Sequence, residues 1–132
     1  MSHRLIQVCA ERDVLIAASV GAKMAQNAGL AAIDCARVET AISELARNLL
    51  THANGGALTL DVVYRANRTG IQVTAQDNGP GIQNVGQALQ DGFTTRDSLG
   101  IGLGVAKRMM DDFSIRSHPG WGTFVIAVKW EH

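Results

Sequence analysis

The stretch from residue 31 to residue 77 constrains the fold most, because its apolar pattern changes from helical to alternating spacing. Within 31–53 the apolar residues recur at helix spacing and predict one buried stripe, formed by Val38, Ala41, Ile42, Leu45 and Leu49. Asn54-Gly55-Gly56 ends this helix with residues that tolerate left-handed backbone angles. Two strands follow, near 57–65 and 70–77, joined by a hairpin-like turn at 67–70. This order predicts a helix next to an antiparallel pair of strands.

The rest of the chain adds elements of the same two kinds. The pattern predicts a strand at 4–9, a helix at 11–27, a helix at 101–112, and strands near 113–117 and 122–130. Residues 82–99 have no clean period and predict a loop, with a short helix around 85–89. Early helices and paired strands predict an α+β fold, a two-layer sandwich in which helices cover one face of a mixed, mostly antiparallel sheet. The 132 residues are the length of a single domain, over residues 1–132.

The composition excludes several classes of function. Twelve basic and twelve acidic residues give no net charge, so the chain lacks the one-sided charge that binds nucleic acid or an acidic membrane surface. No secretory signal and no membrane-spanning apolar run is present, which predicts a cytoplasmic protein. Cys9 and Cys35 have no metal-ligand spacing and are expected to be buried reduced thiols.

Asp77 is the first candidate site residue. Strand 70–77 alternates, so Asp77 continues the face of Ile71, Val73 and Ala75, which the helices should cover. A carboxylate in that position needs a partner, and the exocyclic amine of a bound purine would be one. The alternative is that Asp77 caps its own turn. The glycines of Asp77-Asn-Gly-Pro-Gly81 favour the ligand, because they let backbone approach it closely.

Glu44 and Asn48 are four residues apart and lie on one line of the predicted helix. An amide oxygen suits Mg²⁺, and a carboxylate one turn away could accept the proton of an attacking hydroxyl. The alternative is an ordinary polar helix edge. His52 continues the same line and is expected to pack or to form a supporting hydrogen bond.

Gly100-Ile101-Gly102-Leu103-Gly104 is predicted to form a turn immediately before a helix. Free N–H groups at a helix start, together with the helix dipole, suit phosphate oxygens. The pattern is neither a Walker loop nor a Rossmann turn, and an ordinary glycine-rich turn is the alternative. Lys107, one turn further, could face phosphate or solvent. Asp111 and Asp112 are expected to be a solvated helix end, and Trp121 and Trp130 to be core or partner surface.

Together these motifs resemble a known family. Glu44-x-x-x-Asn48, Asp77-x-Gly79-x-Gly81, Gly100-x-Gly102-x-Gly104 and Gly122-Thr123 are similar to the four ordered signatures of the gyrase, Hsp90, histidine kinase and MutL (GHKL) ATPase superfamily. The likeness covers about residues 30–130. Within that superfamily, the stretches 41–48 and 91–95 are most similar to the small anti-sigma serine kinases of the RsbT switch-kinase type.

The resemblance implies a Bergerat fold that holds ATP between sheet and helices, under a lid at about 83–99. It implies Asp77 on adenine, supported by Thr123, and Asn48 on Mg²⁺. Glu44 would be the base that activates a partner's serine or threonine. The remaining implied ATP contacts are Gly79, Gly81, Ile82 and, at the phosphates, Gly100, Ile101, Gly102, Leu103 and Gly104. No phosphate role is assigned to Thr94, Thr95, Arg96 or Ser98.

Two functions follow from the resemblance. The first is a serine/threonine protein kinase that phosphorylates a STAS-domain antagonist or scaffold in a bacterial partner-switching pathway, for stress or sigma-factor regulation. The second is an ATP-gated binding switch that holds a sigma factor, a phosphatase or a STAS scaffold without transferring phosphate. A domain with a degenerate pocket is a third alternative. The chain is too short for a phosphoacceptor histidine domain, so the acceptor must lie on another protein.

Overall fold

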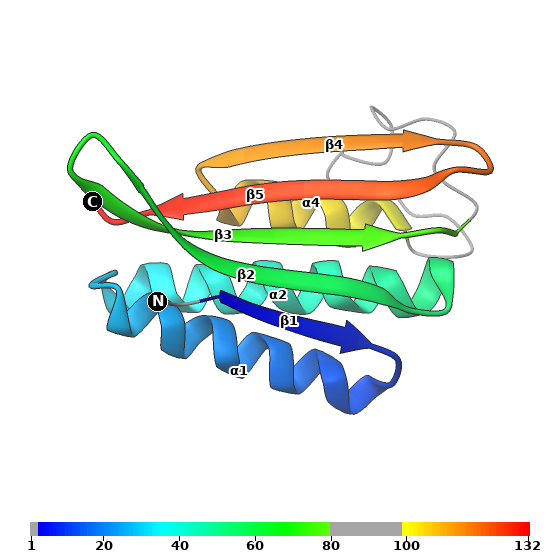
Figure 1. The fold of residues 1–132 in the computed structure, drawn as a ribbon, viewed down its shortest axis with the longest axis horizontal. Coiled ribbons are helices and arrows are strands. Elements are labelled where there is room, and N and C mark those ends of the chain that lie inside the picture. Colours follow the sequence, from blue (N-terminus) through cyan, green and yellow to red (C-terminus); the bar gives the residue numbers. More distant parts are fainter. Residues whose placement is uncertain (1–2, 80–98) are drawn as a thin grey trace.

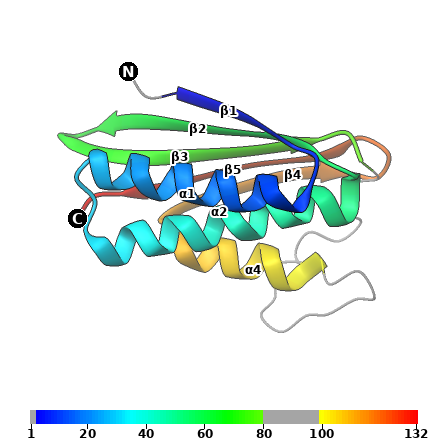
Figure 2. The same cartoon turned by 90° about the horizontal axis from the view of Figure 1, so that it is seen from below.

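The computed structural model describes residues 3–79 and 99–132 and arranges them as a sheet with helices on one face (Figures 1 and 2). The helices are α1 (Glu11–Asn27), α2 (Ala32–Ala53) and α4 (Leu99–Met109). The strands are β1 (His3–Val8), β2 (Gly56–Arg65), β3 (Arg68–Asp77), β4 (Asp112–His118) and β5 (Gly122–Trp130). The predicted α+β two-layer sandwich is confirmed. The short helix predicted around 85–89 lies outside the described residues.

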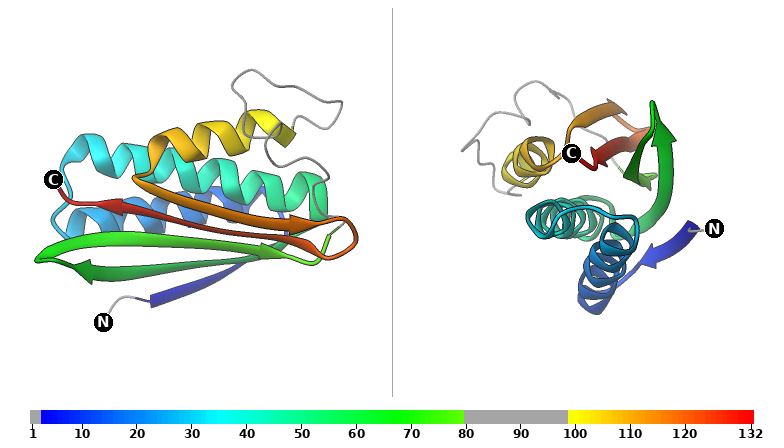
Figure 3. Two further views of the ribbon diagram at one scale, coloured as in Figure 1. Left: turned by 90° about the horizontal axis from the view of Figure 1, so that it is seen from above. Right: turned by 90° about the vertical axis from the view of Figure 1, so that its left-hand side faces the viewer.

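The sheet has the strand order β1-β2-β3-β5-β4, so β1 and β4 are its edges within the described part of the chain. All four pairings are antiparallel, whereas a mixed, mostly antiparallel sheet was expected. The end view shows the sheet curving around the helix layer (Figure 3). Asp77 ends β3 directly opposite Thr123, near the start of β5. The topology thus brings two predicted site residues together across central strands.

The turn between β2 and β3 differs from the predicted one. The two residues with positive φ are Ala66 (50°) and Asn67 (66°), and Arg65 pairs with Arg68 on either side of them. A two-residue turn of this handedness matches the twist of the strands it joins. Gly70 was expected in the turn but lies within β3, where a Cβ atom would be 2.6 Å from the ring of Trp130. Glycine occurs here because the Trp130 ring leaves no room for a side chain. The sequence pattern was interpreted as a turn residue instead, so the predicted turn lay too far along the chain.

Both long helices have ends that the local sequence explains. At the start of α1, the Asp13 carboxylate accepts hydrogen bonds from the backbone N–H groups of Cys9 (2.9 Å) and Ala10 (3.0 Å). These bonds, the one from Cys9 above all, lower the pKa of Asp13 below 3.8. α2 ends at Asn54 in the left-handed conformation (φ 59°), and Gly55 N–H donates to the Leu49 carbonyl at 2.7 Å.

The core lies between the helix layer and the sheet. All five residues of the predicted α2 stripe are buried: Val38, Ala41, Ile42, Leu45 and Leu49. They pack with the inward-facing residues of the central strands, among them Leu58, Leu60, Ile71, Val73 and Val125. The described part of the chain contains no helix with the length and apolar character needed to span a bilayer.

A buried ion cluster joins α2 to the last strand. Asp34 is 4 % exposed and Lys129 is 5 % exposed. The Lys129 ammonium lies 3.6 Å from Asp34 Oδ1 and 3.4 Å from Asp111 Oδ1, and Arg37 Nη1 lies 3.0 Å from Asp34 Oδ1. Asp111 Oδ2 also accepts the backbone N–H of Trp130 at 2.8 Å. Asp111 follows the end of α4 and is exposed, as predicted, but its carboxylate also acts as a structural acceptor.

Asp112 has a similar structural role, and the two tryptophans differ. The indole N–H of Trp130 donates to Asp112 Oδ2 at 2.8 Å. The guanidinium groups of Arg65 and Arg68 lie 4.8 and 5.6 Å from the Trp130 ring centre. Trp130 is buried, whereas Trp121, in the β4–β5 hairpin, is 82 % exposed. Asp112 is exposed, as predicted, but it begins β4 and its carboxylate also accepts hydrogen bonds from Trp130 and Arg65.

The cysteines are free, as predicted, but their predicted burial was wrong. Cys9 is exposed at the end of β1, and Cys35 is half-buried in the first turn of α2. Burial raises the pKa of the Cys35 thiol, and the nearby charge of Asp34 adds to this. The apolar residues beside Cys9 misled the prediction, because Cys9 follows the last residue of an edge strand.

Candidate functional site

α4 packs alongside α2 (Figure 2), and Gly102 on α4 faces the predicted polar pair on α2. A Cβ atom on Gly102 would lie 3.0 Å from Glu44 Oε2 and 3.1 Å from Asn48 Oδ1. The absent side chain leaves the polar ends of both residues facing the backbone of α4. The structure thus brings together three residues that the sequence had placed in two separate motifs. We call this contact the α2–α4 seam, formed by Glu44, Asn48 and Gly102.

Asn48 has a buried donor that the described residues do not satisfy. Its Nδ2 atom is inaccessible to solvent and has no hydrogen-bond partner among residues 3–79 and 99–132. A buried amide without a partner costs roughly 1–3 kcal/mol. Such a group is expected where a ligand completes the bonding. The Nδ2 donor suits a phosphate oxygen, and the Oδ1 acceptor on the same amide suits a hard cation such as Mg²⁺.

The carboxylate of Glu44 is half-buried in the seam. Oε2 faces Gly102, and Oε1 lies 3.7 Å from Nη1 of Arg47 on the same helix. Arg47 also lies 3.8 Å from Glu11 Oε1 on α1, which holds its side chain between the two helices. The guanidinium partly offsets the charge of Glu44 while leaving Oε2 directed at the seam. A carboxylate in this position can accept a proton from a hydroxyl that approaches Gly102.

Asp77 caps its own turn, and its position leaves the predicted contact with a ligand possible. Its Oδ1 accepts the backbone N–H of Gly79 at 2.8 Å, so it does cap its own turn. Its side chain also leaves the sheet on the helix side, because a Cβ atom on Gly56 would touch both Asp77 Cβ (3.2 Å) and Leu49 Cδ2 (2.9 Å). The carboxylate is half-buried. The Oδ1 bond leaves Oδ2 available to a donor such as an exocyclic amine.

Thr123 is held by a residue that the sequence analysis missed. Ser117 Oγ lies 2.9 Å from Thr123 Oγ1 and donates to the Gly122 carbonyl at 2.9 Å. Either hydroxyl could donate in the contact between Ser117 and Thr123, and this contact holds the Thr123 hydroxyl on the side of the sheet that Asp77 also faces. The spacing of β4 could have identified Ser117. Phe113, Ile115 and Ser117 are every second residue of the strand and share its helix-facing side, where Ser117 lies beside Thr123.

Gly122 fixes the distance between these two strand ends. Its φ is 92°, and a Cβ atom there would lie 2.2 Å from the Asp77 carbonyl oxygen. Any other residue would push β5 away from β3 and separate Thr123 from Asp77. A hollow of about 130 Å³ opens here, and its lining includes Asp77, Ser117, Trp121 and Thr123.

The glycine run does not form the predicted turn before a helix. α4 begins at Leu99, two residues earlier than expected, so Gly100, Ile101, Gly102, Leu103 and Gly104 all belong to its first turns. The helix predicted at 101–112 overlapped this run, but the poor helix propensity of glycine had favoured a turn for the three glycines. Leu103 is 2 % exposed and packs in the core, so only its backbone could meet a ligand. Gly81, Ile82 and the predicted lid lie outside the described residues.

The other polar candidates remain at the margin of the site. His52 is half-buried one turn beyond Asn48, and Lys107 is exposed on α4. No group of three or more His, Cys, Asp or Glu side chains that could hold a metal ion occurs within the described residues. Mg²⁺ commonly takes few protein ligands and completes its coordination with phosphate oxygens and waters.

Comparison with known proteins gives matches that agree with one another, and two of them cover nearly the whole chain. Residues 10–129 match the model of the histidine kinase-like ATPase domain. The chain is 39 % identical to serine/threonine-protein kinase RsbT of Bacillus subtilis (strain 168), over 95 % of this chain and 94 % of that protein. It is 35 % identical to anti-sigma F factor of Caldanaerobacter subterraneus subsp. tengcongensis, over 74 % of this chain and 71 % of the relative. For anti-sigma F factor of Thermoanaerobacter sp. (strain X514) the identity is 33 %, with the same coverage.

Proposed function

This chain belongs to the histidine kinase-like ATPase domain family, and on that premise we propose that it is an ATP- and Mg²⁺-dependent serine/threonine protein kinase. The acceptor in this proposal is a STAS-domain antagonist or scaffold protein in a bacterial partner-switching pathway. The observation that carries the proposal is the α2–α4 seam, where a carboxylate and an unsatisfied amide converge on a glycine backbone. The similarity to a named serine/threonine-protein kinase over nearly the full length supports it.

The proposed roles follow from the chemistry of each side chain. Asp77 Oδ2 accepts the adenine amine, and Thr123 supports that contact through the hydroxyl that Ser117 orients. Asn48 would bind the phosphate region, and its Oδ1 is the acceptor that would hold Mg²⁺. The metal, when bound, neutralises charge on the phosphates. The N-terminal turns of α4 offer backbone N–H groups to phosphate oxygens.

Glu44 is the proposed general base. Its Oε2 takes the proton of the acceptor's serine or threonine hydroxyl as the hydroxyl oxygen forms a bond to the γ-phosphorus of ATP. The bond between that phosphorus and the β,γ-bridging oxygen breaks, and the electron pair leaves with ADP. Phosphoryl transfer depends mostly on positioning and charge neutralisation, so few catalytic side chains are needed.

Radiolabelled ATP tests the proposal with STAS-domain proteins as candidate acceptors. Glu44→Gln should keep ATP binding and lose about 10²- to 10⁴-fold in transfer, because only the base is removed. Asp77→Asn should weaken ATP binding by roughly tenfold to a hundredfold, because a charge-assisted hydrogen bond is lost. Glu39→Gln is the matched control, an exposed glutamate on α2 away from the seam. Equal transfer by Glu44→Gln and the parent chain would reject the assigned base.

A second function is favoured by the names of two relatives. Both are anti-sigma F factors, and they are 35 % and 33 % identical to this chain. We therefore keep an ATP-gated binding switch, directed at a sigma factor or a phosphatase, as the alternative. Size-exclusion chromatography with and without ATP separates the two. An ATP-dependent complex in which no label is transferred would support the switch, and label on the partner supports the kinase.

A further inference from the structure

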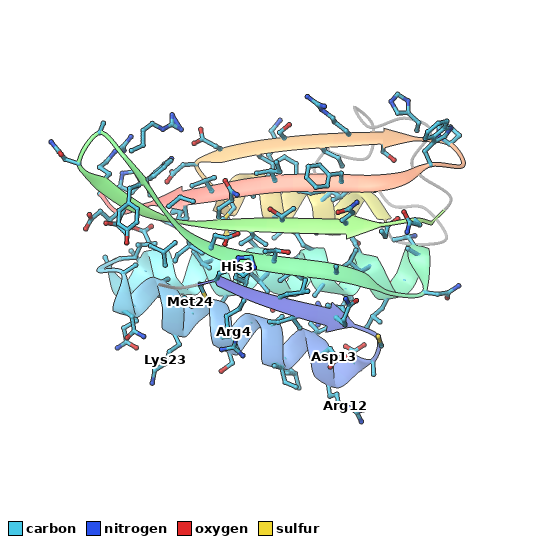
Figure 4. All side chains as sticks on the ribbon, viewed as in Figure 1. His3, Arg4, Arg12, Asp13, Lys23 and Met24 are labelled. Carbon is cyan, nitrogen blue, oxygen red and sulfur yellow. The ribbon has the colours of Figure 1, made fainter. Side chains whose placement is uncertain are left out.

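A second surface lies away from the seam, between β1 and α1 (Figure 4). It is a groove of about 410 Å³, within the range of roughly 300–1,000 Å³ that ligand pockets occupy. We call it the β1–α1 groove, and its lining includes His3, Arg4, Val20, Lys23, Met24 and Asn27. Val20 and Met24 provide apolar surface, and the other four residues are polar or basic.

The charge of this groove is one-sided. Arg4 and Lys23 both line it, and no carboxylate does. Neither cation has an ion-pair partner within the described residues, whereas Arg37, Arg65 and Lys129 all do. The imidazole of His3 is bonded to Asp61. The chain as a whole has no net charge, so the positive charge of the groove does not reflect a generally basic protein. It comes from the residues that line the groove.

The groove runs beside a free strand edge. β1 pairs only with β2 among the described strands, so the backbone groups of its other edge are open to pairing. Arg4 pairs with Leu60 and Leu5 with Thr59, so the two side chains point to opposite faces of the sheet. Leu5 is 58 % exposed, and Leu15 (71 %) and Ile16 (49 %) add exposed apolar surface on α1. An extended peptide that pairs with β1 would therefore meet both apolar and cationic side chains.

We propose that the β1–α1 groove docks an extended acidic segment of a partner protein. The segment adds to the free edge of β1 as a further strand, and its carboxylates pair with Arg4 and Lys23. Backbone pairing supplies affinity, and the two cations select acidic sequence. This goes beyond the proposed kinase, because the groove is formed by other elements than the seam and works whether or not phosphate is transferred.

NMR with the ¹⁵N-labelled full chain tests the proposal. The probe is a six-residue peptide, the length of β1, that alternates glutamate and leucine, and the control peptide has lysine for glutamate. Amide shifts should cluster on β1 and α1 with the acidic peptide, and be absent with the lysine peptide. Arg4→Glu and Lys23→Glu should each weaken binding about tenfold, because an attraction becomes a repulsion. Both residues are exposed, so unchanged melting temperatures verify the folds.

Arg116→Glu is the matched control for charge. Arg116 is an exposed arginine on β4, the opposite edge strand, and the peptide should bind this variant as it binds the parent. Glu44→Gln should also bind normally, which separates this proposal from the kinase assignment. Absence of shifts, or equal loss in Arg116→Glu and Lys23→Glu, would overturn it. So would equal shifts with oligothymidine or anionic lipid vesicles, or concentration-dependent β1 shifts without peptide, which would assign the edge to a second copy.

Discussion

Two buried polar groups lie along α2, and they differ in whether the protein itself satisfies them. Near the N-terminal end, Asp34 is in contact with Arg37 and Lys129. Further along, the Nδ2 atom of Asn48 is buried and has no partner within the described residues. The first arrangement joins α2 to β5, and the second leaves bonding capacity directed at α4. Burial alone thus does not single out a candidate functional group, whereas burial without a partner in the described residues calls for an explanation such as a ligand.

The largest expected effect concerns Asp34, the buried group whose charge the protein itself pairs. Lys129→Met should lower the free energy of unfolding by about 3 kcal/mol or more, because it leaves Asp34 and Asp111 without their shared cation. Urea denaturation measures the change. The double variant Lys129→Met/Asp34→Leu should recover much of the loss, since an apolar pair can replace a buried ion pair. A Lys129→Met chain as stable as the parent would remove this half of the comparison.

A substitution of Asn48 should change the free energy of unfolding in the opposite direction. Asn48→Leu removes a buried amide that lacks a partner and should raise the free energy of unfolding by roughly 1–2 kcal/mol. The same change should abolish the rise in melting temperature that ATP and Mg²⁺ give the parent chain. Thermal unfolding with and without nucleotide measures both. A destabilised Asn48→Leu protein would mean that the amide is already bonded.

The smallest effect concerns pH. Burial alone would raise the pKa of Asp111, but hydrogen bonds from Trp130 N–H and His132 and the charge of Lys129 outweigh it and lower the pKa below 3.8. A lowered folded-state pKa stabilises the fold above the unfolded-state value and loses that contribution as pH falls through the folded one. Stability should therefore decline below about pH 4. The Asp111→Asn variant should be less stable than the parent at neutral pH. Its urea midpoint of unfolding should also fall less steeply than that of the parent as the pH is lowered.

Local patterns were sufficient to predict most elements of the fold. The α2 stripe is continuous and ends in Asn54-Gly55-Gly56, so both the helix and its end were predictable. The α1 bounds agree as well. The start of α4 was predicted two residues late and its first turns were interpreted as a turn, because glycine disfavours helix in isolation and packing of Gly102 against α2 explains its presence there. Tertiary contact also explains Gly70, which was predicted to lie in the turn.

The candidate site was predictable only where its residues belong to short motifs. Glu44 and Asn48 share one helix line, and Asp77 follows a clear alternation, so spacing identified them. Ser117 has no motif of its own and gains its role only by lying beside Thr123 across β4 and β5. The Asp34–Lys129 pair joins residues far apart in sequence, and no local pattern indicates such a contact.

Because the two tryptophans differ in exposure, their intrinsic fluorescence can report on binding. Trp130 is enclosed under two guanidinium groups at the far end of β5 and should emit at short wavelength, whether or not nucleotide is present. Trp121 is open to water and borders the same hollow as Asp77, so its emission should respond to an occupant. Intrinsic fluorescence, without any attached dye, can therefore follow binding at one end of the molecule against a constant internal reference at the other.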